Sequence, residues 1–214
     1  MRLKLVSAAA AAALSISLLG VTSASAATEF GDNCIADRGS AVEGGSKITI
    51  FGISSPSSPF PMAAPSGGVV TAWKLNLITP PAPQPSIPAI IPQTLKVLRL
   101  NPAAKTAQVV GESSGLVGSG LNTIPARIPI QPGDRLGLFG EGPITSGGMT
   151  SEIGTLYCDL VGTPSDIVGA FPGTAPVGAS AAYEEGSESR VPAVAVVEPD
   201  ADNDGFGDET QDKC

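Results

Sequence analysis

The chain has 214 residues, a formal net charge of −8 and no histidine. The excess of negative charge argues against nucleic acid or an anionic membrane surface as a partner, because phosphate groups would be repelled. The absence of histidine excludes Ser-His-Asp and Cys-His catalysis and removes the usual ligand of catalytic zinc. The composition therefore favours a cation as a ligand.

Residues 1–26 have the layout of a secretory signal peptide. Arg2 and Lys4 precede an apolar, alanine-rich stretch, which ends in small residues at Ala26. The stretch is short and no stop-transfer pattern follows it, so we expect cleavage after Ala26 instead of a membrane anchor. We expect a protein that is secreted or held at the cell surface, with no membrane span.

Residues 27–198 have the pattern of an all-β domain. Short runs rich in β-branched residues recur between glycine and proline turns, and no long stretch has the apolar period of a helix. Trp73, Leu75 and Leu77 alternate onto one face, which predicts that Trp73 lies in the core. The pattern predicts a β-sandwich or barrel. The expected strands span residues 47–53, 69–78, 94–100, 106–112, 123–130, 135–140, 152–160 and 191–198.

Prolines predict which segments lie at the surface. The segment 79–93 is rich in proline, which removes ladder donors, so we expect a long surface loop. Prolines also interrupt 123–130, which predicts a broken strand or an edge strand. The polar segment 183–190 is expected to be a hairpin loop.

Three cysteines in an exported chain predict one disulfide and one remaining thiol. We expect Cys34 to pair with Cys158, which would join the beginning of the domain to a late strand. Cys214 would then have no partner within the chain.

The last fifteen residues, DADNDGFGDETQDKC, carry the strongest motif. Aspartates stand at positions 1, 3 and 5, and Gly205 stands at position 6, where a sharp turn is needed. Alternate carboxylates on such a turn can face one centre, and hard oxygen ligands of this number favour Ca²⁺. The ligands expected from this pattern are Asp200, Asp202, Asp204, the carbonyl of Phe206 and Asp208.

The motif differs from an EF-hand because Gln211 occupies position 12, where a bidentate glutamate is required. It resembles a thrombospondin type 3 repeat, in which D-x-D-x-D-G-x-x-D is followed by another aspartate and a cysteine. The resemblance implies that Asp212 is a further ligand, although it stands one residue later than in the family. It also implies that residues 199–214 form a short, irregular calcium-binding segment.

A looser resemblance covers most of the chain. The segments GGVVTAWKL, LKVLRL and IPIQPGDRLGL, followed by the aspartate-rich end, are similar to a group of secreted actinobacterial proteins. Those proteins join a jelly-roll-like β-sandwich to a calcium-binding repeat. The resemblance implies the same architecture for this chain, but no activity.

Three functions remain open. The first is a calcium-binding structural or adhesive module without catalytic residues. The second is a carbohydrate-binding sandwich, and the third is a glycosidase that uses two carboxylates. Ser113 lies in a G-x-S-x-G sequence, but that motif needs a histidine and a strand-turn-helix elbow, so we expect no catalysis there. The extracellular partner, a protein or a glycan, is not specified by the sequence.

Overall fold

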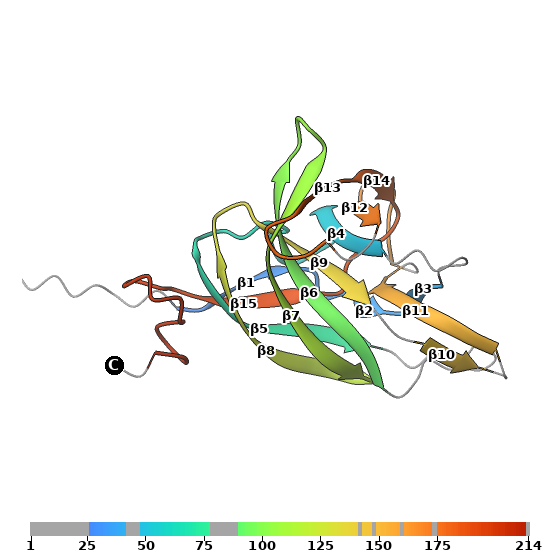
Figure 1. Ribbon diagram of the computed structural model, residues 1–214, viewed down its shortest axis with the longest axis horizontal. Coiled ribbons are helices and arrows are strands. Elements are labelled where there is room, and N and C mark those ends of the chain that lie inside the picture. Colours follow the sequence, from blue (N-terminus) through green and yellow to red (C-terminus); the bar gives the residue numbers. More distant parts are fainter. Residues whose placement is uncertain are drawn as a thin grey trace, which may run out of the picture.

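The computed structural model describes residues 26–41, 48–77, 90–140, 143–146, 149–158, 161–172 and 175–212. These residues form fifteen strands and no helix, which confirms the predicted all-β fold (Figure 1). The described part of the chain accordingly contains no helix long and apolar enough to cross a bilayer. Most of the predicted signal peptide lies outside the described residues.

One layer is a five-stranded sheet in which β5 is the central strand. β15 pairs antiparallel with β5 on one side, and β8 pairs antiparallel with it on the other. β1 extends the sheet beyond β15, and the short β2 runs parallel to the end of β5. The strands are β1 (Thr28–Gly31), β2 (Ile35–Ala36), β5 (Gly68–Leu77), β8 (Gly120–Ile130) and β15 (Val194–Glu198).

The second layer is a seven-stranded antiparallel sheet in the order β13-β7-β6-β9-β4-β12-β14. The hairpin of β7 and β8 joins the two layers, because β7 belongs to this sheet and β8 to the other. The strands are β4 (Ile48–Ser54), β6 (Ile90–Asn101), β7 (Thr106–Gly118), β9 (Arg135–Gly140), β12 (Ile167–Pro172), β13 (Ser180–Ala182) and β14 (Glu184–Ser187).

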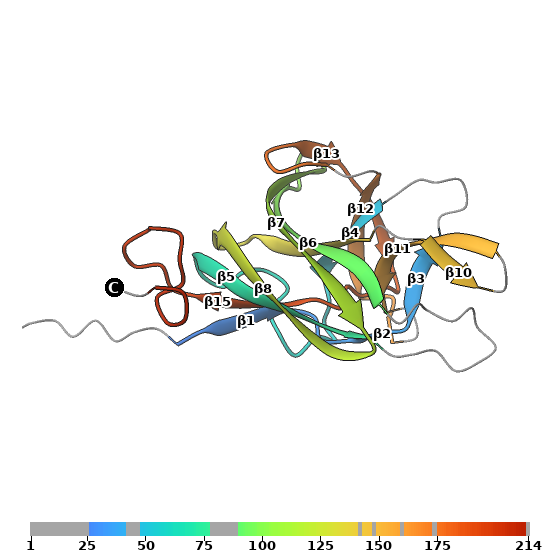
Figure 2. The same ribbon diagram turned by 60° about the horizontal axis from the view of Figure 1, so that its bottom comes forward.

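A small three-stranded sheet lies beside these layers, at the end where β2 is found (Figures 1 and 2). It pairs β10 with β11 and β11 with β3. Its strands are β3 (Arg38–Ala41), β10 (Pro143–Ser146) and β11 (Met149–Tyr157).

The two large sheets bury one apolar core between them. Trp73, which is fully buried, lies in a cluster with Leu95 and Leu138 of the opposite sheet. Its indole Nε1 donates to the hydroxyl of Ser113 at 3.2 Å, so the polar atom of this core side chain is satisfied. The prediction that Trp73 is a core residue is confirmed.

Two predicted loop boundaries differ from the structure. β6 begins at Ile90, inside the segment expected to be a loop, and Pro92 belongs to the strand. Pro92 pairs with β7, whereas pairing with β9 begins at Gln93, so the proline lies where β6 has a neighbour on one side only, a position in which proline is tolerated. Residues 79–89, the remainder of that segment, lie outside the described residues.

The polar segment expected to be a hairpin loop contains β14, an edge strand with all four residues exposed. Antiparallel pairing with β12 holds β14 in place. The strand therefore forms because of its partner, since its own residues carry no pattern typical of a strand. The proline-containing β8 pairs with β5 alone, which confirms that it is an edge strand.

The predicted disulfide between Cys34 and Cys158 is present. Cys158 is fully buried and Cys34 is almost so. The backbone of Cys158 pairs with that of Arg190, so the disulfide joins the beginning of the chain to two late segments of it. A disulfide of this kind is typical of oxidising compartments.

Candidate metal centre

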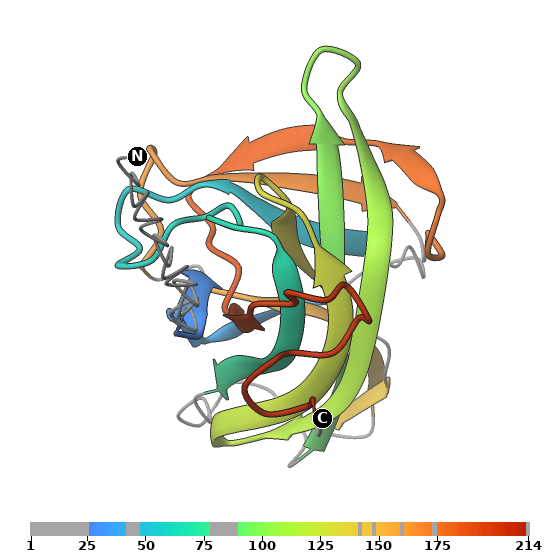
Figure 3. The same ribbon diagram turned by 90° about the vertical axis from the view of Figure 1, so that its left-hand side faces the viewer.

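The aspartate-rich segment begins where β15 ends. Figures 2 and 3 show residues 199–212 as the dark red loop at one end of the sandwich, beside the ends of β5 and β8. Its turns are irregular and contain no strand. The segment is therefore positioned by side-chain contacts with the five-stranded sheet.

Glu198, the last residue of β15, is the main anchor of this segment. Its side chain is buried, yet no cation faces it among the described residues. Its Oε2 accepts the N–H groups of Glu209 and Thr210 at 3.2 and 2.9 Å. Its Oε1 accepts the hydroxyls of Thr210 and Thr71 at 2.7 and 3.0 Å. One buried carboxylate thus joins the sheet to the far end of the loop.

The hydrogen bonds determine the ionisation of Glu198. Burial by itself raises the pKa, but the Thr210 hydroxyl, the Thr210 N–H, the Thr71 hydroxyl and the Glu209 N–H together lower it below its ordinary value of 4.5. A carboxyl group whose pKa is lowered on folding stabilises the folded state above its ordinary pKa. That contribution is lost as the pH falls through the lower, folded pKa.

Replacing Glu198 with glutamine is expected to release the 207–211 turn. The amide places an NH₂ group against donors and cannot accept all four hydrogen bonds. We expect protection of the Thr210 amide from hydrogen exchange to fall about 30-fold at pH 7, from a loss of about 2 kcal/mol. The difference from the native protein should disappear only below pH 4.5, where the native carboxyl also becomes protonated.

Glu209→Gln is the matched control, because it removes an equal charge from the same turn on an exposed side chain. It should leave the protection of Thr210 unchanged. Equal protection in Glu198→Gln and the native protein at pH 7 would contradict the anchoring role of Glu198.

Two contacts fasten the loop to the edge strand β8. The Arg127 guanidinium lies 3.6 Å from the centre of the Phe206 ring, and its Nε donates to the Gly205 carbonyl at 3.0 Å. Gln211 donates from Nε2 to the carbonyl of Ala126 at 2.8 Å. Gln211 distinguishes the motif from an EF-hand, and the structure shows that it serves to dock the loop on the sandwich.

The backbone turns as the motif predicts. Gly205 has φ of 83°, and Asn203 has φ of 61°, a conformation that asparagine adopts more readily than most residues. The Gly205 N–H donates to Asp200 Oδ2 at 3.2 Å, and the Ala201 N–H lies 3.1 and 3.2 Å from the two oxygens of Asp208. These bonds turn the two carboxylates toward the inside of the loop.

Three carboxylates converge within the loop. One oxygen each from Asp200, Asp202 and Asp208 lies within 4.8 Å of the others. Asp200 Oδ1 is buried from solvent and has no hydrogen-bond partner in the described part of the chain. Three negative charges at this separation repel one another, and a buried oxygen without a partner is costly. A cation at their centre would remove both penalties.

The carboxylates of Asp204 and Asp212 do not belong to this cluster. The Asp204 carboxylate is exposed and accepts the Phe206 N–H at 2.8 Å. Asp212 donates its own N–H to the Gly207 carbonyl at 3.0 Å, in the turn that Glu198 holds. The roles of Asp204, the Phe206 carbonyl and Asp212 as ligands stay predictions, and Cys214 lies outside the described residues.

The structure gives Ser113 a structural environment. It lies in β7, with no strand-turn-helix elbow, and its hydroxyl lies between Trp73 Nε1 and the Pro125 carbonyl, each at 3.2 Å. Asp134 is buried and accepts two hydrogen bonds of 2.9 Å from Arg99, which fixes the turn before β9. Both side chains thus have hydrogen-bond partners that stabilise the fold.

Comparisons with protein-family models, with curated proteins and with solved structures gave no match. The resemblances to a thrombospondin type 3 repeat and to secreted actinobacterial sandwich proteins therefore stay predictions. The functional argument depends on the geometry of the loop and its attachment to the sandwich.

Proposed function

We propose that the protein is a secreted or cell-surface module whose C-terminal loop binds Ca²⁺, and that its role is structural or adhesive and not catalytic. Two observations carry the proposal: one oxygen each of Asp200, Asp202 and Asp208 converges within the loop, and Asp200 Oδ1 is buried without a hydrogen-bond partner. The disulfide supports an oxidising compartment.

The spacing of the three carboxylates fits a calcium ion. Ca²⁺ lies 2.3–2.6 Å from its ligands, so oxygens on opposite sides of one ion are about 5 Å apart. The separation of at most 4.8 Å among the three oxygens is compatible with this distance. Further oxygens are needed to reach six to eight ligands, and Asp204 and the Phe206 carbonyl are the predicted sources within the loop.

Bound Ca²⁺ would hold the loop in a compact conformation. The sheet side of the segment is already held by Glu198 and Gln211. Residues 200–204 are mostly exposed, and in the described part of the chain their side chains and N–H groups bond to other residues of the loop. Two positive charges among the three carboxylates reduce the repulsion that opposes this compact turn. The ion would thus complete a rigid end of the sandwich, which suits a protein that joins other extracellular components.

Titration calorimetry tests the metal site. We expect Ca²⁺ to bind with a dissociation constant near millimolar or tighter, and Mg²⁺ to bind more weakly because it needs a tighter octahedron. Asp200→Asn and Asp202→Asn should each weaken Ca²⁺ binding at least about tenfold, the change that a loss of 1.4 kcal/mol produces. A similar loss in Asp204→Asn would add that residue to the ligand set.

The control is again Glu209→Gln, which removes one charge from the same segment without touching the cluster. It should reduce the affinity only slightly, through the general field of the loop. Absence of calcium-dependent heat in the native protein, or an equal loss in the control and in Asp202→Asn, would refute the proposed site.

Proteolysis tests the structural role. Cleavage after Arg127 and within residues 199–212 should slow at saturating Ca²⁺ and become faster in chelator, since the ion orders the loop. The same cleavage rates with and without the metal, in a protein that binds Ca²⁺ by calorimetry, would separate binding from rigidification and refute the mechanical role.

A further inference from the structure

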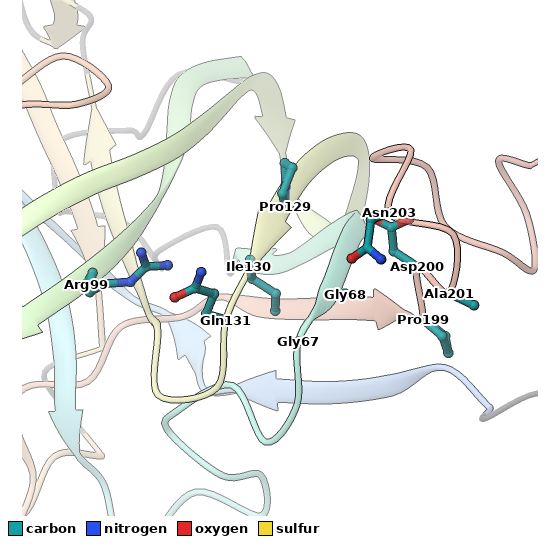
Figure 4. Close-up of a pocket in the computed structure, with 10 residues that line it drawn as sticks. All are labelled: Gly67, Gly68, Arg99, Pro129, Ile130, Gln131, Pro199, Asp200, Ala201 and Asn203. Carbon is teal, nitrogen blue, oxygen red and sulfur yellow. The ribbon is translucent and has the colours of Figure 1, made fainter.

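A polar cavity of about 650 Å³ lies between the aspartate loop and the end of the sandwich (Figure 4). Arg99 and Gln131 lie on one side of it, and the loop residues Asp200 and Asn203 lie on the other. The backbone of Gly67 lines the part between the two sides. The volume falls within the range of small-ligand sites, and one wall is formed by the proposed calcium loop.

The charged groups of this cavity are largely compensated. The Nε and Nη2 atoms of Arg99 each lie 2.9 Å from an oxygen of Asp134, so this pair is neutral as a unit. Asp200 belongs to the cluster of three carboxylates, and the proposed Ca²⁺ would offset two of their three negative charges. No net positive charge is left to hold a phosphate or a carboxylate, and most of the negative charge that would attract a second cation is compensated.

The remaining polar groups suit hydroxyls. Arg99 Nη1 makes no hydrogen bond to Asp134, and Gln131 and Asn203 contribute amides, each of which donates and accepts. Hydroxyls also donate and accept, so they match amides without leaving an unpaired atom. Pro129 and Pro199 add apolar ring faces to the wall, and these suit the C–H faces of a sugar ring.

We propose that this cavity binds a short neutral oligosaccharide, and that the calcium loop forms one wall of the site. The inference depends on the proposed calcium function, because the ion would order the loop that carries Asp200 and Asn203 and would offset most of the charge beside the cavity. Binding should therefore require Ca²⁺ even where the sugar makes no contact with the ion.

Saturation-transfer NMR with maltotriose, cellotriose, mannotriose and β-1,4-galactotriose tests the site, with trigalacturonate as an acidic probe. We expect at least one neutral trisaccharide to bind at saturating Ca²⁺ and to lose its signal in chelator. Gln131→Ala and Asn203→Gly should each weaken binding about two- to tenfold, as expected for a lost hydrogen bond. Glycine keeps the positive φ of position 203, so the change removes only the amide.

A filling variant gives the sharpest test. Gly67 is exposed and has an ordinary φ, and a Cβ added there would come no closer than 3.4 Å to its neighbours. Gly67→Leu should therefore fold and abolish trisaccharide binding. Gly186→Leu on β14 is the matched control, since a Cβ there meets only Val168 at 3.8 Å. It should leave trisaccharide binding intact.

Calcium calorimetry on the same samples separates the two proposals. Normal Ca²⁺ binding without binding of any neutral trisaccharide overturns the sugar site alone, whereas absence of Ca²⁺ binding overturns the metal site on which the sugar site depends. Trisaccharide binding that survives Gly67→Leu would overturn the assignment of this cavity to a neutral sugar. A stronger signal from trigalacturonate than from every neutral trisaccharide would overturn it as well.

Discussion

Replacing Arg190 with methionine is expected to lower the free energy of unfolding by about 3–5 kcal/mol. Arg190 is 8% exposed, and its Nε and Nη2 bind the two oxygens of Asp32 at 2.7 and 2.5 Å. Asp32 is fully buried and also accepts the Cys34 N–H at 3.0 Å. Methionine preserves the aliphatic packing but leaves the carboxylate without its cation in a medium of low polarity.

Equilibrium unfolding in urea at fixed Ca²⁺ measures this effect. The double variant Asp32→Asn with Arg190→Met should be less destabilised than the two single changes added together, because it leaves no unpaired charge. Lys74→Met is the surface control, because it removes an ion pair with Glu29 in which both side chains are about one-third exposed. It should lower the free energy of unfolding by less than about 1 kcal/mol. A loss below 1 kcal/mol in Arg190→Met would contradict a stabilising role for the pair.

The ion pair shows what the sequence could not predict. Asp32 and Arg190 are 158 residues apart, and Arg190 stands in a polar segment that was expected to be a loop. The backbone of Arg190 pairs with that of Cys158, and the disulfide of Cys158 holds Cys34 nearby. Because Asp32 is two residues from Cys34, it is brought close to Arg190. No local pattern encodes this meeting, since it depends on the tertiary arrangement of three distant segments.

Strands were predictable where they carry their own apolar face. β5 alternates Trp73, Leu75 and Leu77 into the core, and its expected and observed bounds differ by one residue at each end. β14 is exposed along its whole length, so only its pairing with β12 defines it. Similarly, β6 begins earlier than expected, because Pro92 lies where the strand has a neighbour on one side only and proline is tolerated.

The local turn of the loop was predictable, and its attachment was not. The spacing of the aspartates predicted a sharp turn at Gly205 and the convergence of Asp200, Asp202, Asp204 and Asp208; the structure contains the turn and brings all of these carboxylates except Asp204 into one cluster. No pattern in the sequence connects Gln211 with Ala126, 85 residues earlier. Side-chain docking of this kind depends on which edge strand lies beside the loop.

Removing the disulfide by replacing Cys34 and Cys158 with alanine is expected to lower the free energy of unfolding by about 4–5 kcal/mol. The cysteines are 124 residues apart in sequence, so the bridge restricts most of the unfolded domain. The loss should overlap with that of Arg190→Met, because Cys34 and Cys158 position the backbone on both sides of the ion pair.

Urea unfolding in a Cys214→Ser background measures the loss without thiol exchange, and calorimetry on the same proteins tests its reach. Ile35, next to Cys34, pairs with Asn76 near the end of β5, whereas Glu198 at the loop pairs with Val69 near its beginning. Calcium affinity should therefore be the same in the variant as in the native protein, under conditions in which the variant is folded. A stability loss below about 1 kcal/mol would contradict the constraint on the unfolded chain, and a parallel fall in calcium affinity would show that the two ends of β5 are coupled.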